Sequence, residues 1–148
     1  MRGVHSYDDP HGHFRAFYTS NATIEVAAGT AKQKLDSRAV YGSMSMPDGS
    51  HQDIYVLMFM AVSDDYNFSR RADHLTISAD GRTIAANLHH GLRGKAIMGA
   101  LEIWYYWLSR ESLKRIAEAG TVQIHIDNLS GTMSRDEQDL IKQLIAGN

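Results

Sequence analysis

Three polar residues of types that carry out acid–base chemistry occur in or beside strongly apolar stretches of this sequence. Glu102 lies within the most apolar run, at 97–108, and His125 and Asp127 belong to the alternating run at 122–127. A carboxylate in an apolar strand is unfavourable to bury unless it is paired or protonated. If the two runs form neighbouring strands with aligned polar faces, Glu102, His125 and Asp127 meet as a candidate catalytic cluster or ligand clamp.

Two aromatic residues of the first run are candidate ligand-binding groups. In a strand, Trp104 and Tyr106 share a face with Glu102, because successive side chains alternate between the two faces. The alternative is an outward face with scattered polar residues, on which Glu102 makes only a cross-strand pair. The run at 97–108 places aromatic rings on both faces, and its second face is a candidate for core, ligand groove or subunit interface.

The chain contains eight histidines, and two of them have the spacing of a metal-ligand pair. In a strand, His11 and His13 would point to one face, so that two imidazoles could share an ion. The pair resembles the His-x-His ligands of cupin metal sites, although the Glu of that pattern has no nearer counterpart than Glu25. Asp8 and Asp9 offer carboxylates for an N-terminal site instead. The alternative, which we favour, is a His-rich arm without a resident metal or cofactor.

The sequence lacks the motifs of several enzyme and ligand classes. It has no cysteine, which excludes disulfides, thiol catalysis and zinc–thiolate sites. It has no Gly-x-Ser-x-Gly, and Gly94-Lys95 lacks the glycine spacing and the following Ser or Thr of a phosphate-binding loop. A net charge of -2 gives no general attraction to nucleic acid or to anionic membranes. We therefore expect no nucleic-acid partner and no membrane association, despite the local basic pairs at 70–71 and 93–95.

The segment at 97–127 organises the expected fold as a strand, a helix and a second strand. Ser109 can cap the helix, Gly120 can end it, and β-branched residues alternate along 122–126. A later helix has the capping box formed by a Ser at 134 and a Glu three residues on. Both helices have an apolar stripe that can pack on a sheet.

The remainder of the chain is typical of antiparallel strands. Alternating or continuous apolar runs predict strands at 14–26 (two short strands or one bent strand), 40–46, 54–62, 74–78 and 83–88. Asp80-Gly81 is a strong hairpin signal, whereas 29–36 and 89–94 resemble loops. The prediction is a mainly β, α+β fold: an antiparallel β-sandwich-like or rolled sheet of about seven or eight strands, with two amphipathic helices near the C-terminus.

The chain is expected to be one soluble domain with a short extension. Residues 1–13 are polar and predict a flexible N-terminal arm, and residues 14–148 predict a single globular domain. No signal peptide is visible, and the longest apolar run is short and interrupted by Glu102. A cytoplasmic location is the default expectation, with export left open.

The segment from Glu102 to Leu144 resembles the C-terminal part of uncharacterised bacterial β-sandwich domains. Those domains run from an aromatic strand with a Glu, through a Leu-Ser-x-Glu-x-Leu-x-x-Ile-Ala-x-Ala helix, to a Val-x-Ile-x-Ile strand, a Gly-containing turn and a closing helix. The matching residues are Glu102, Leu108, Ser109, Glu111, Leu113, Ile116, Ala117, Ala119, Val122, Ile124, Ile126, Gly131, Leu140 and Leu144. The resemblance implies a fold and attaches no activity to it.

Taken together, the residues favour a non-enzymatic module that binds a protein partner or a second copy of itself through the aromatic run at 97–108. A strongly specified fold without a complete catalytic signature is the reason for this preference. The alternative is a small hydrolase or isomerase-like enzyme, or a ligand-binding protein, built on Glu102, His125 and Asp127 or on a metal at His11 and His13. Fold class alone does not decide between them.

Overall fold

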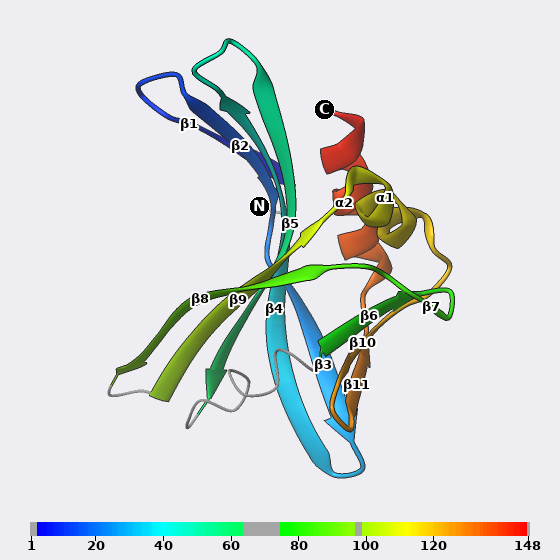
Figure 1. Ribbon diagram of the computed structural model, residues 1–148. Coiled ribbons are helices and arrows are strands. Elements are labelled where there is room, and N and C mark those ends of the chain that lie inside the picture. The colour runs from blue at the N-terminus through cyan, green and yellow to red at the C-terminus, as the bar shows by residue number, and fades with distance from the viewer. Residues whose placement is uncertain (1–2, 64–74, 97–98, 148) are drawn as a thin grey trace.

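The structure is a computed structural model that describes residues 3–63, 75–96 and 99–147 (Figure 1). In these residues the chain forms one curled antiparallel sheet with two helices, so the expected mainly β class with two helices is confirmed. The strands are β1 (Val4–Asp8), β2 (Phe14–Thr19), β3 (Ala22–Ala28), β4 (Ala31–Ser45), β5 (His51–Ser63), β6 (Leu75–Ala79), β7 (Arg82–Thr83), β8 (Asn87–Ala96), β9 (Gly99–Leu108), β10 (Val122–Ile126) and β11 (Leu129–Thr132). The helices are α1 (Arg110–Glu118) and α2 (Arg135–Ala146).

The long strand β4 links two parts of the sheet. The strand order is β7-β6-β10-β11-β3-β4-β5-β9-β8, and β1 and β2 form a hairpin that joins β4 beside its second half. β4 therefore pairs with β3 in its first half and with β2 in its second half, while β5 runs along its other edge. Where the partner changes, Thr19 Oγ1 accepts a hydrogen bond from the Ala39 amide at 3.0 Å. This bond to a side chain satisfies a buried amide where β4 passes from one partner strand to the other.

Both helices lie on the inner face of the curled sheet (Figure 1). The side chains of Leu35, Ser37 and Ala39 on β4 are buried on this face, and the hydroxyl of Ser37 donates a hydrogen bond to Glu137 of α2. The core lies between this face and the apolar stripes of the helices. No helix in the described residues is long and apolar enough to cross a membrane.

The helix caps expected from the sequence are present. Ser109 Oγ accepts from the Ser112 amide at 3.0 Å, and Ser134 Oγ accepts from the Glu137 amide at 3.2 Å. These serines satisfy amides that the first helical turns leave without intrahelical partners. α1 ends at Glu118, two residues before the glycine expected to end it.

The first turn of α2 holds the end of α1. Gln138 Nε2 donates to the carbonyls of Ile116 and Ala119 at 3.0 and 2.8 Å. Arg135 donates to the carbonyls of Ala119 and Gly120 at 3.1 and 3.0 Å. Carbonyls in the last turn of α1 and just after it, which accept no hydrogen bond within the helix, are thereby satisfied by side chains from α2.

The Asp80-Gly81 turn is a hairpin turn, as expected. Both residues have positive φ, at 51° and 81°, the conformation that a two-residue hairpin loop of this type requires. The Asp80 carboxylate also accepts hydrogen bonds from the amides of Thr121 and Gly120, at 3.0 and 3.2 Å. These bonds lower the pKa of Asp80 and fix the start of β10 against the turn between β6 and β7.

Three expectations about local structure were wrong. Residues 4–8, expected as part of an irregular arm, form β1 and pair with β2; a turn at Gly12, with φ of +72°, reverses the chain. Residues 31–36 belong to β4 and 89–94 belong to β8, although 29–36 and 89–94 were expected as loops. The first half of β4 looks like a loop in sequence because its outward positions reach solvent and carry polar side chains.

Substitution of Gly131 tests how closely β11 approaches β3. A Cβ atom at Gly131 would lie 2.3 Å from the Glu25 carbonyl oxygen and 3.0 Å from Val26 Cγ1. We expect Gly131→Ala to lower the free energy of unfolding by about 2–3 kcal/mol, because backbone must move to admit the methyl group. Urea denaturation measures this. Gly3→Ala is the control, since a Cβ there meets nothing within 4 Å, and equal stabilities of the two variants would contradict the expectation.

The carboxylate of Asp80 makes part of the stability dependent on pH. Because its pKa is lower in the folded protein than the ordinary value of about 3.9, its contribution is complete above that value and is lost as the pH falls through the folded pKa. We expect Asp80→Asn to lower the urea midpoint at pH 7 and to differ less and less from the wild type below about pH 3.9. Asp139→Asn on α2 controls for the loss of one exposed charge, and a pH-independent effect of Asp80→Asn would contradict the assignment.

Candidate functional site

The three candidate acid–base residues do not come together. Glu102 lies on the inner face of β9 and is 1% exposed, whereas His125 on β10 and Asp127 after it lie on the outward side. Four strands, β11, β3, β4 and β5, separate β10 from β9 in the sheet. The condition for the cluster, two neighbouring strands with aligned polar faces, is therefore not met.

Glu102 instead occupies a buried cross-strand position. Its neighbours in register are Ala61 on β5 and Arg93 on β8. These backbone pairs place Glu102 in the interior of the sheet, between β5 and β8.

The two expected aromatic ligand groups are part of the core. Trp104 and Tyr106 are each 3% exposed and contact the ring of Phe59, at centroid distances of 5.9 and 5.8 Å. The Trp104 contact is stacked and the Tyr106 contact is edge-to-face, which are the favourable arrangements of aromatic rings. These two rings pack the sheet and offer no surface to a ligand.

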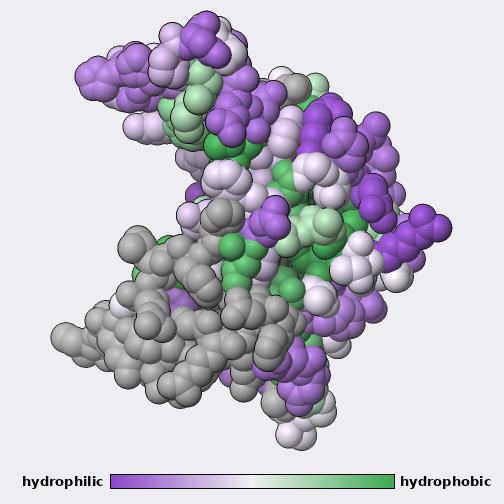
Figure 2. Space-filling view, in the orientation of Figure 1, coloured by the Kyte–Doolittle hydropathy of each residue, from purple (hydrophilic) through white to green (hydrophobic). Residues whose placement is uncertain are grey.

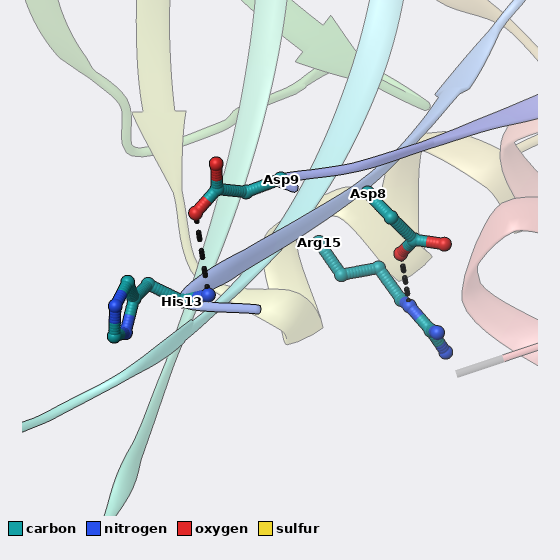
Figure 3. A network of polar contacts seen from close by, with 4 residues as sticks. All are labelled: Asp8, Asp9, His13 and Arg15. Atoms are coloured by element: carbon teal, nitrogen blue, oxygen red, sulfur yellow. Dashed lines mark hydrogen bonds and ion pairs between the residues drawn. The ribbon is translucent and has the colours of Figure 1, made fainter. Parts of the chain in front are cut away.

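The histidines of the N-terminal hairpin are not arranged around an ion. The backbone amide of His13, and not its ring, donates to Asp9 Oδ2 at 3.3 Å, and the ring points away (Figure 3). Asp8 forms an ion pair with Arg15 at 2.5 Å. His11 is exposed in the turn between β1 and β2. Among the described residues, no three His, Asp or Glu side chains are grouped so that they could hold a metal ion.

A polar hollow of about 450 Å³ lies between the tips of the β1–β2 and β4–β5 hairpins. Figure 2 shows hydrophilic residues gathered around this end of the molecule. Its lining comes from four strands and their turns, so that no local motif announces it: Asp8, Asp9, Gly12, His13, Phe14, Arg15, Ser43, Ser45 and His51. Most of these side chains are solvent-exposed, so little holds them in one arrangement.

Two tyrosines lie deeper on the same inner face. Tyr41 and Tyr55 pack with a centroid distance of 5.1 Å, and Tyr41 Oη donates to Asp53 Oδ1 at 2.9 Å. Burial, followed by the nearby Asp53 carboxylate, raises the pKa of Tyr41, and burial likewise raises the pKa of Tyr55. Both hydroxyls therefore remain protonated at neutral pH, and that of Tyr41 is a hydrogen-bond donor.

The opposite face of β5 and β9 carries a continuous apolar ladder, which we call the outer face. In register, Val56 lies opposite Trp107, Met58 opposite Tyr105, Met60 opposite Ile103, and Val62 opposite Leu101. All eight side chains are at least partly accessible, and Val62, Leu101 and Trp107 are 65%, 38% and 38% exposed. Both helices lie on the other side of the sheet, against the face of Ser37.

Two charges of opposite sign border the outer face on β4. Asp36 lies opposite Met60 and Arg38 lies opposite Met58. Asp36 accepts from Thr23 Oγ1 at 3.0 Å, and the Arg38 guanidinium lies 4.8 Å from the centre of the Tyr18 ring. A hollow of about 210 Å³ lies at this border and is lined by Asn21, Asp36, Ser37, Arg38, Met58, Met60 and Ile103.

Comparisons with protein-family models, with curated proteins and with solved structures found no match.

The two tryptophans of β9 should respond differently to truncation. Trp104→Ala removes a buried ring, and we expect it to destabilise the fold by about 3–5 kcal/mol. Trp107→Ala removes a ring from the outer face, and we expect a loss of about 1 kcal/mol. Denaturant unfolding measures both. A Trp104→Ala protein as stable as Trp107→Ala would contradict the assignment of Trp104 to the core.

Proposed function

We propose that this protein is a non-enzymatic interaction module and that the outer face of β5 and β9 is its contact surface. The single observation that carries the proposal is the ladder of four apolar cross-strand pairs on the side of the sheet away from the helices. A contiguous apolar surface of this kind, bordered by polar residues, is typical of interaction sites.

The residue types on this surface support a protein partner. Tyr, Trp, Met and Arg are enriched where proteins meet, and the outer face and its border contain Tyr105, Trp107, Met58, Met60 and Arg38. Aromatic and Arg side chains also contribute most of the binding free energy in many interfaces. Beside the methionines of β5, the border carries one acidic and one basic residue, Asp36 and Arg38.

Two edges of the sheet, those of β7 and β8, are less suited to bind a partner. β7, at one end of the sheet order, has only two residues. β8, at the other end, has an irregular register between His90 and Arg93. Short edge strands and bulges both discourage the addition of a further strand. The outer face is therefore a better contact surface than these two edges.

The enzymatic alternative has little support from the arrangement of the candidate residues. It requires Glu102 and His125 in one site, and these residues lie on opposite faces of the sheet, four strands apart. It also has no grouping of metal ligands in the described residues on which to build.

Photo-crosslinking from the outer face tests the proposal. A benzophenone amino acid replaces Tyr105 on β9, and the protein is irradiated in the cells that produce it. We expect covalent adducts with protein at this position, because benzophenone reacts with C–H groups in direct contact. Denaturing gel electrophoresis and mass spectrometry then give the mass of each adduct, which separates a second copy from another protein.

The matched control is the same amino acid at Gln123, an exposed outward position on β10. We expect far fewer adducts from position 123 than from position 105. Equal adduct yields at the two positions, or none at position 105, would refute the outer face as a contact surface.

A further inference from the structure

We propose that the outer face binds a second copy of this chain, packed face to face about a two-fold axis that crosses β5 between Met58 and Met60. This inference rests on the proposed function and adds to it the identity and orientation of the partner. It follows from the register of β4, β5 and β9 and from the positions of the two charges on β4.

The register arranges the outer face in rows across three strands. One row is Arg38, Met58 and Tyr105, and the next row is Asp36, Met60 and Ile103. The proposed two-fold axis lies in the plane of the contact, perpendicular to the strands and midway between these two rows. Rotation about this axis places the first row of one copy over the second row of the other copy. The contact is then isologous, with the same surface on both subunits.

Among the in-plane axes perpendicular to the strands, charge complementarity selects this one. Arg38 of one copy faces Asp36 of the other, and the reverse pair forms on the other side of the axis, so two ion pairs border the contact. An axis passing through either row would instead place two arginines or two aspartates opposite each other, which is unfavourable. A strongly acidic or strongly basic partner would leave one of the two charges opposed by a like charge.

The apolar residues match under the same operation. Met58 faces Met60, Tyr105 faces Ile103, and the pair of Val56 and Trp107 faces the pair of Val62 and Leu101. The hollow of about 210 Å³ at Met58, Met60 and Ile103 lies next to the axis. Flexible methionine side chains adapt to such gaps, so the second copy's methionines can fill it.

The resulting assembly has a known type of geometry. In aligned sandwiches, two sheets pack face to face about 10 Å apart with their mean strand directions within about 30° of each other. The β-sandwich-like arrangement expected from the sequence would then be completed between two chains. Because a two-fold contact uses the same face on both copies, the assembly closes at two chains.

A charge-swap series measured by sedimentation velocity tests the inference. We expect the wild type to show a concentration-dependent dimer. Arg38→Glu places carboxylates opposite carboxylates, and Asp36→Arg places arginines opposite arginines, so each single variant should raise the dimer Kd by more than about tenfold. The double variant Asp36→Arg, Arg38→Glu restores both pairs in reverse and should dimerise again.

Mixing the two single variants gives a second, independent measurement. The Arg38→Glu chain is acidic at both positions and the Asp36→Arg chain is basic at both, so the mixture should form a heterodimer more tightly than either variant forms a homodimer. Thermal unfolding of each variant controls for the intramolecular contacts of Asp36 with Thr23 and of Arg38 with Tyr18.

The outcomes separate this inference from the proposed function. A monomeric wild type, single variants that dimerise normally, or failure of both the double variant and the mixture to dimerise would each refute the two-fold dimer. Adducts from position 105 with the mass of another protein would refute the second copy as partner and leave the outer face as the contact surface. Absence of adducts at position 105 would refute both.

Discussion

The alternation of side chains along β4 determines what each face of this sheet can do. Ser37 faces inward and contacts Glu137, which holds α2 on the inner face. The residues on either side of it, Asp36 and Arg38, face outward beside the methionines of β5. β3 and β2 share one edge of β4, and β5 pairs with the other edge. A shift of β4 by one residue against these partners would move its inward side chains to the outer face and its outward side chains to the inner face. The bond from Ala39 to Thr19 lies where the partner strand changes, and it fixes that register.

The parts of the fold that were correctly predicted have local signals. Ser109 and Ser134 cap their helices through amides three residues on, and Asp80-Gly81 supplies two positive φ angles within a single turn. The first half of β4 was missed, because its outward positions carry the lysines at 32 and 34 and so give the segment the composition of a loop. The hairpin of β1 was missed for a similar reason, since residues 6–8 are exposed and only pairing with β2 makes them a strand.

Whether the candidate residues Glu102 and His125 meet depends on the order of the strands in the sheet, which a single sequence does not contain. β9 and β10 are consecutive strands along the chain, joined by α1, yet the crossover places four other strands between them. That separation excludes contact between Glu102 and His125. The aromatic run correctly predicted rings on both faces of one strand, but the face that turned inward was set by packing against Phe59. Trp104 thus belongs to the core, and its neighbour Tyr105 belongs to the surface.

The position of β11 has a consequence for biosynthesis. β11 pairs with β3 through Ser130 and Ala27, and the glycine next to Ser130 lets it approach the β3 backbone closely. On the ribosome, β3 is made before β4 to β10, and the strand that covers its free edge, β11, follows all of them. The nascent protein therefore exposes an unpaired strand edge while these intervening strands are being made, the period in which such edges promote misassembly. Closure of the sheet at β3 has to wait until β11 has been synthesised.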